Sequence, residues 1–135
     1  TAANVDQDII RCRKDDKFEH LRDILTKTEL KKVLIFSETK RDVEKLTKNL
    51  ETSGFRADSI HGDKRQSQRQ KALSRFKQDE IQILVATDVA ARGLDINNVS
   101  HVINYTIPQT YTDYIHRIGR TGRGTKSGQA LTFVE

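Results

Sequence analysis

The chain has 135 residues, of which 35% are hydrophobic and 32% are charged, and its formal net charge is +5 at pH 7. This length fits one domain with a real core and excludes two domains of ordinary size. A single cysteine, Cys12, excludes an internal disulfide, and the four histidines lack zinc-ligand spacing, so we expect no metal site. No apolar run approaches the roughly 18 residues that span a bilayer, so we expect no membrane contact. The positive charge favours an anionic partner without separating RNA, DNA, nucleotide or mere solubility.

Short apolar runs alternate with helical patterns along the whole chain. Residues 1–4 resemble a linker or the leftover edge of a longer chain, and one domain is expected over residues 5–135. Strands are predicted at 5–9, 33–36, 55–60, 81–86, 99–104 and 130–134. Strands that alternate with helices favour a mostly parallel central sheet with helices on both faces, which is an α/β fold.

Helices are predicted between the strands from apolar residues at helical spacing. Thr39 and Thr110 have the spacing of helix caps, Asp15 or Asp16 is available as a cap for the first helix, and Gly54 is placed to end the second. The apolar faces contain Phe18, Leu21 and Leu25; Val43, Leu46 and Leu50; Ala72, Leu73 and Phe76; and Tyr114 and Ile115.

The loops that follow the predicted strands hold the polar residues of interest. In parallel sheets, ligands bind at the carboxyl ends of the strands. The segments 37–40, 61–69 and 87–95 follow three different strands. We therefore expect these three loops to lie at the edge of the sheet where ligands bind.

The segment His-Arg-Ile-Gly-Arg-Thr-Gly-Arg at 116–123 places three arginines at three-residue spacing around two glycines. Guanidinium groups hold phosphate oxygens two at a time, and glycine lets a phosphate chain approach the backbone. The pattern favours a polyphosphate ligand and is typical of arginine fingers that act on a γ-phosphate. The alternative is a solvated basic turn.

The segment Ala-Thr-Asp-Val-Ala-Ala-Arg-Gly-Leu-Asp begins at the end of a predicted buried strand. Thr87, Arg92 and the backbone near Gly93 are suited to a nucleic-acid phosphate, and Asp95 is suited to ribose hydroxyls. The alternative is that Asp88 and Asp95 are helix caps and that Arg92 is simply exposed.

Together these two segments closely resemble the last two motifs of the DEAD-box RNA helicases. Phe-Ser-Glu-Thr-Lys at 36–40 and Gln-Ser-Gln-Arg at 66–69 resemble two further motifs of that family, in the expected order. The resemblance covers essentially the whole chain as the second, carboxy-terminal RecA-like domain. It implies a RecA-like α/β fold over residues 5–135.

The resemblance also implies roles for individual residues. Arg120 and Arg123 match the catalytic arginines that reach the γ-phosphate of ATP, and Asp95 and Gly93 match positions near the nucleotide. His116 and Arg117 match positions that couple the ATP site to the interdomain contact. The positions that match RNA-backbone contacts are Thr39, Lys40, Gly62, Asp63, Arg69, Thr87, Arg92 and Gly93. Capping is an equal alternative for Thr39, Gln66 is an alternative cap that orients Arg69, and Lys64 and Arg65 are interpreted as nonspecific charge.

One apparent phosphate loop is dismissed. Gly119 and the segment 124–127 nearly spell that motif, but Thr125 is an extra residue and a strand follows instead of a helix. The sequence Asp-Glu-Ala-Asp does not occur either. We therefore interpret the chain as half of an enzyme. ATP and Mg2+ are expected to be held mainly by a missing N-terminal domain. We expect the isolated domain to be inactive and monomeric.

The resemblance implies that the full-length protein is an ATP-dependent RNA helicase, cytoplasmic by default, in which domain closure unwinds short RNA duplexes. Its expected partners are single-stranded or duplex RNA and the N-terminal RecA-like domain of the same protein. The alternatives are a DNA helicase or translocase of the wider superfamily, and a scaffold that has lost catalysis. The scaffold would be expected to lack some of the arginines that this chain retains.

Overall fold

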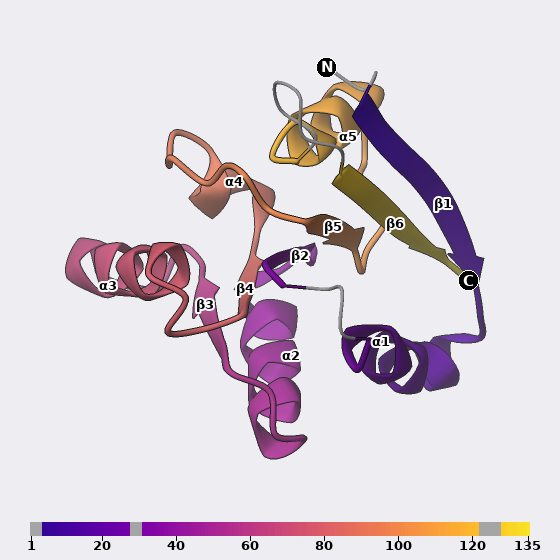
Figure 1. Cartoon of the computed structure of the whole chain (residues 1–135), viewed down its shortest axis with the longest axis horizontal. Coiled ribbons are helices and arrows are strands. Elements are labelled where there is room, and N and C mark those ends of the chain that lie inside the picture. Colours follow the sequence, from indigo (N-terminus) through magenta and orange to yellow (C-terminus); the bar gives the residue numbers. More distant parts are fainter. Residues whose placement is uncertain (1–3, 28–30, 122–127) are drawn as a thin grey trace.

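The computed structural model describes residues 4–27, 31–121 and 128–135 (Figure 1). In this part of the chain, six strands form one sheet in the order β1-β6-β5-β2-β4-β3, and every neighbouring pair is parallel. The strands are β1 Val5–Arg11, β2 Val33–Phe36, β3 Ala57–Ile60, β4 Ile83–Ala86, β5 His101–Asn104 and β6 Gly128–Val134. The helices are α1 Lys17–Leu25, α2 Lys40–Thr52, α3 Gln66–Lys77, α4 Asp88–Ala91 and α5 Tyr111–Ile118, and a 3-10 turn at Lys14–Asp16 precedes α1. The predicted RecA-like α/β fold is confirmed.

Helices cover both faces of the sheet. Adjacent residues of a strand point to opposite faces, so Val33 and Ile35 pack against α1 and α2. Leu34 and Phe36 pack against α3 and α4 on the other face. Ile118 of α5 lies on Val5 and Ala130, over the end of the sheet that β1 and β6 form (Figure 1).

The predicted ends of α2 and the start of α5 are confirmed. The Thr39 hydroxyl oxygen accepts a hydrogen bond from the Asp42 amide at 3.1 Å. The Thr110 hydroxyl oxygen accepts one from the Asp113 amide at 3.0 Å. Gly54 follows α2 with φ of 94°, and its amide donates to the Glu51 carbonyl at 3.0 Å. This is the left-handed glycine ending that the sequence predicts.

Three expectations on local structure are corrected. Asp16 stands at the start of α1, but no side-chain cap is made there. The 3-10 turn holds Asp16 in helical backbone geometry, whereas a capping side chain requires extended backbone. The segment 87–95, expected as a loop, contains the short helix α4. Strands β3, β4 and β5 each begin two residues later than predicted, because residues 55–56, 81–82 and 99–100 lie outside the sheet ladder.

No helix in the described ranges is both long and apolar enough to cross a membrane. Cys12 is partly buried among the side chains that pack around α1 and α2. Of the expected terminal segment at 1–4, residues 1–3 lie outside the described residues.

Candidate functional site

The carboxyl ends of β2, β3, β4 and β5 meet at one edge of the sheet because all of these strands are parallel. A groove of about 360 Å³ lies at this edge, between the loops and the start of α5. Its lining includes four residues that the sequence assigns to RNA, namely Lys40, Gly62, Thr87 and Arg92, and also Arg117. The fold therefore brings residues from three separate loops together at the predicted edge of the sheet.

A smaller cavity of about 50 Å³ adjoins the groove and shares Arg92 and Arg117 with it. His116 and Arg120 complete its basic lining. Asp88 and Asp113 also line both this cavity and the groove, and they form ion pairs with Arg117 and Arg92, so the lining holds both positive and negative charge. Arg123 and the neighbouring Gly122, also part of the predicted motif, lie outside the described residues.

Arg117 is buried and makes every one of its contacts within the domain. Its Nε and Nη2 atoms donate to the Asp88 carboxylate at 2.7 and 2.6 Å. Its Nη1 donates to the Asn104 side chain at 3.1 Å and to the Thr106 carbonyl at 2.8 Å, and the guanidinium lies 5.0 Å from the Phe36 ring centre. Arg117 therefore ties α5 to α4 and to the end of β5, which places the basic residues beside it.

Arg120 is held against the segment that follows α4. Its Nη1 donates to the Leu94 carbonyl at 3.1 Å, and its Nη2 donates to the Ala91 carbonyl at 3.3 Å. These acceptors are neutral carbonyl groups, and the Asp95 carboxylate is near enough for Arg120 to help lower its pKa. The fold therefore orients the Arg120 side chain beside α4.

The segment after β4 contains a helix cap, an exposed arginine and a glycine with positive φ. The buried Thr87 hydroxyl caps α4 by accepting the Ala90 amide at 3.3 Å. Arg92 is exposed and lies 3.8 Å from the Asp113 carboxylate. Gly93 has φ of 79°, a conformation that favours glycine. Arg92 is therefore exposed, as the alternative interpretation expects, and it also lines the groove.

Asp95 lies apart from both cavities, on the exposed surface beside α3. Its carboxylate accepts a hydrogen bond from the Lys77 ammonium at 3.2 Å and one from the Asn97 side-chain amide at 2.6 Å. The hydrogen bond from Lys77 is the main reason that the pKa of Asp95 is lowered. Asp95 lines neither cavity, but it lies near enough to Arg120 for that charge to contribute to the lowering of its pKa.

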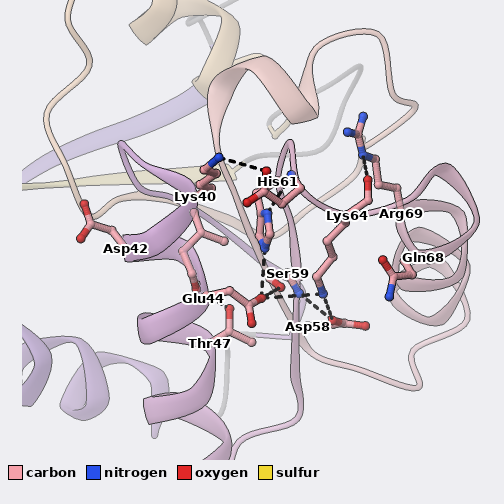
Figure 2. Close-up of polar contacts among 12 residues, drawn as sticks. Lys40, Asp42, Glu44, Thr47, Asp58, Ser59, His61, Lys64, Gln68 and Arg69 are labelled. Atoms are coloured by element: carbon pink, nitrogen blue, oxygen red, sulfur yellow. Dashed lines mark hydrogen bonds and ion pairs between the residues drawn. The ribbon is translucent and has the colours of Figure 1, made fainter.

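The loop between β3 and α3 is held from several sides (Figure 2). Arg69 does not point into the groove; its Nε donates to the Lys64 carbonyl at 3.2 Å, and its Nη2 donates to the Gly62 carbonyl at 3.3 Å. Lys40 and Asp63 form an exposed ion pair with 3.0 Å between Nζ and Oδ1. Arg69 thus fixes the loop from the α3 side, and Lys40 contacts it from the start of α2.

Two interpretations of this loop are corrected. The helix-capping side chain is Gln68, which accepts the Arg65 amide at 2.9 Å, and not Gln66, which is the first residue of α3. Lys64 is more than nonspecific charge, because its Nζ lies 3.3 Å from the Asp58 carboxylate.

Sequence reasoning missed the polar residues that hold the site together. They are Glu44, Asp58, Ser59, His61, Asn104 and Arg75, and each bonds to a residue distant in the sequence. Asn104 had a local signal, since it is a polar residue that ends a buried apolar strand. The described ranges contain no group of three His, Cys, Asp or Glu side chains that would hold a metal ion.

This fold and the basic site at the carboxyl edge of its sheet define a RecA-like domain of the helicase type. Residues 16–125 match the family described as the helicase conserved C-terminal domain, and the chain belongs to that family. It is the second RecA-like domain of the DEAD-box group, as the relatives below show.

The ATP-dependent RNA helicase CshA of Listeria monocytogenes is 46% identical over 135 residues, which is 100% of this chain and 26% of that protein. The ATP-dependent RNA helicase DBP3 of Mycosarcoma maydis is 51% identical over 85% of this chain and 20% of its own length. A solved DEAD box protein from Methanococcus jannaschii superposes with a TM-score of 0.91 at 45% identity, covering 98% of this chain and 36% of the other. The C-terminal domain of the DEAD-box protein Dbp5 gives 0.90 at 32% identity, covering 100% and 79%. The chain therefore spans between 20% and 26% of the length of these two curated relatives.

Proposed function

We propose that this chain is the RNA-binding and arginine-supplying half of an ATP-dependent RNA helicase. In this proposal the groove binds the RNA backbone, and Arg120 and Arg123 act on ATP that the N-terminal RecA-like domain holds. The observation that carries the proposal is the placement of Arg120 in a basic cavity that adjoins the groove with Lys40, Gly62 and Thr87.

The groove supports binding to the RNA backbone in preference to the bases. Its candidate contacts are the basic side chains Lys40 and Arg92, and the exposed backbone at Gly62. Contacts of this kind recognise phosphates and sugars and carry little sequence information. We therefore expect RNA binding with weak sequence preference and strong salt dependence.

The basic cavity supports a role in stabilising phosphate charge. ATP supplies the transferable γ-phosphoryl group, whose negative charge an arginine finger stabilises in the transition state. On this chain, Arg120 would contact the phosphate, while Arg117 keeps α5 in place through Asp88. Magnesium is assigned to the N-terminal domain.

The decisive experiment measures ATP hydrolysis by the full-length protein with and without single-stranded RNA. Arg120→Ala should lower RNA-stimulated hydrolysis by about 10³-fold or more, the range typical of an arginine finger. The matched control is Arg56→Ala. Arg56, like Arg120, donates to backbone carbonyls, those of Asp79 and Glu80 at 3.2 Å, but it lies just before β3 at the opposite edge of the sheet.

Unchanged hydrolysis in Arg120→Ala would remove the proposed role. DNA of the same sequence serves as a second activator. Equal stimulation by DNA and RNA would contradict the assignment of RNA as the partner and favour a DNA helicase or translocase.

A further inference from the structure

A polar cluster between α2 and the β3–α3 loop has no place in the function proposed so far. Its centre is the Glu44 carboxylate, which accepts the Ser59 hydroxyl at 2.7 Å and faces His61 Nε2 at 3.2 Å (Figure 2). Lys64 Nζ lies 3.9 Å from the same carboxylate and 3.3 Å from Asp58. Glu44 thus receives donors from the strand and the loop at once.

The contacts of His61 fix its tautomer. Its Nδ1 lies 3.3 Å from the Asp63 backbone nitrogen, and an amide N–H can only donate. Nδ1 must therefore be the acceptor, and the ring proton of the neutral imidazole is on Nε2, where it donates to Glu44. With its side chain only 7% exposed, His61 is a buried link between the carboxylate and the backbone of the loop.

The Glu44 carboxylate is suited to accepting the hydrogen bond from His61 because it is held in its charged form. The hydrogen bond from Ser59 is the largest cause that lowers the pKa of Glu44, and the contact with His61 acts in the same direction. A charged acceptor forms stronger hydrogen bonds than a neutral one. The Glu44 carboxylate is therefore charged at neutral pH.

The loop that His61 holds carries Gly62. This glycine lies on the groove, its φ is outside the left-handed range, and a Cβ atom added to it would meet no atom within 4 Å. Neither backbone conformation nor packing within the domain requires glycine there. A glycine of this kind is suited to the close approach of a ligand to the backbone.

We propose that Glu44 and His61 are positioning residues that hold the Gly62–Asp63 backbone ready for an RNA phosphate. Glu44 orients the His61 ring, the ring holds the Asp63 amide, and Arg69 holds the Gly62 carbonyl from the other side at 3.3 Å. The pair touches no RNA and acts through the loop. This proposal rests on the proposed function, because it assigns RNA to the groove.

The contact itself is tested by NMR on the 135-residue chain. Imidazole 15N shifts should report the Nε2–H tautomer for His61, and the Asp63 amide should exchange slowly with solvent. His61→Gln keeps a donor near the Nε2 position and loses the Nδ1 acceptor. Faster exchange at Asp63 is expected in this variant, and His20→Gln on the exposed surface of α1 is the control. A His61 ring protonated on Nδ1 would overturn the proposal.

The functional consequence is tested in the full-length protein by RNA-stimulated ATP hydrolysis. Glu44→Ala and His61→Gln should each raise the RNA concentration for half-maximal stimulation about tenfold, the order expected when one hydrogen bond is lost. The rate at saturating RNA should stay within about twofold. Glu44→Gln retains an acceptor and should recover most of the affinity, and Glu51→Ala, an exposed glutamate on the same helix, should change nothing.

The outcomes separate the two proposals. If the unchanged protein shows no RNA dependence, the proposed function fails and the positioning role fails with it. If the unchanged protein binds RNA but His61→Gln and Glu44→Ala bind it equally well, only the positioning role is overturned. Thermal melting checks the fold of each variant, and His61→Gln keeps the test decisive should Glu44→Ala unfold.

Discussion

Two glycines at the carboxyl edge of the sheet, Gly62 and Gly93, differ in what the backbone requires of them. Gly93 has φ of 79°, which strains any residue with a Cβ atom. Gly62 has no such φ and has open space at the Cβ position. The backbone conformation therefore requires glycine at Gly93 and does not require it at Gly62, where we propose the approach of an RNA phosphate.

Gly62→Ala should leave the free energy of unfolding unchanged or raise it by about 0.4–1 kcal/mol, since alanine restricts the unfolded chain. RNA affinity should fall about tenfold, because the methyl group occupies the approach to the backbone. Gly93→Ala is the contrasting variant, with an expected loss of about 1–2 kcal/mol from the left-handed conformation. Urea unfolding and RNA titration measure the two effects; a destabilised Gly62→Ala would contradict this interpretation.

The ionisation of Glu44 should make the free energy of unfolding depend on pH. The hydrogen bond from Ser59 lowers the pKa of folded Glu44 below the value of 4.5 that applies to an unperturbed glutamate. Its stabilising contribution is therefore present above that pH and is lost as the pH falls through the folded pKa. The difference in urea midpoint between the unchanged protein and Glu44→Gln should shrink as the pH falls below 4.5. A difference that stays constant on acidification would argue against an ionised Glu44.

At the scale of elements, α4 and α5 are joined by an ion pair between the buried Arg117 and the partly exposed Asp88. Arg117 is 3% exposed and binds both oxygens of Asp88, which lies in the first turn of α4. Neither helix is long, so each depends on contacts with its neighbours more than on its own propensity. The basic cavity between them depends on this tie.

Arg117→Met should lower the free energy of unfolding by about 3 kcal/mol, because it leaves the Asp88 carboxylate without its buried partner. Thr110→Ala, which removes only the cap of α5, should cost about 1 kcal/mol. Chemical denaturation of both variants makes the comparison. Similar small losses in the two would show that the ion pair contributes little to joining the helices.

The sequence predicted those elements whose signals are local. The apolar run at β2, the Thr39 cap and the Gly54 ending each depend on neighbouring residues, and each was confirmed. Helix α4 was missed because four residues are too few for a helical period. The contacts of Arg117 with Asp88 and of Glu44 with His61 join positions that no short-range pattern relates. The fold alone brings them together.

At the scale of the whole molecule, the chain spans 26% and 20% of the length of the CshA and DBP3 relatives. The net charge of +5 adds a general attraction for polyanions. Electrostatics should therefore dominate the affinity for RNA.

The salt dependence of RNA binding is the measurement that belongs to this scale. Arg92→Gln should reduce the slope of log affinity against log salt by about 0.7, the value for one phosphate contact to a single strand. The loss should be similar for RNAs of different sequence. A slope that does not change would mean that Arg92 contacts no phosphate, and a loss confined to one sequence would indicate contact with a base.

The sheet order also has a consequence for the route by which the chain folds. Strand β1 is at the edge of the sheet, and its described strand neighbour is β6, with Val5 opposite Gly128 and Arg11 opposite Val134. The first strand of this domain must therefore wait for its last strand before the two can pair. Pairing of such distant segments is slow, because a long loop must close first. During synthesis, β2 to β5 can assemble early, and pairing of β1 with β6 completes the sheet as the final step.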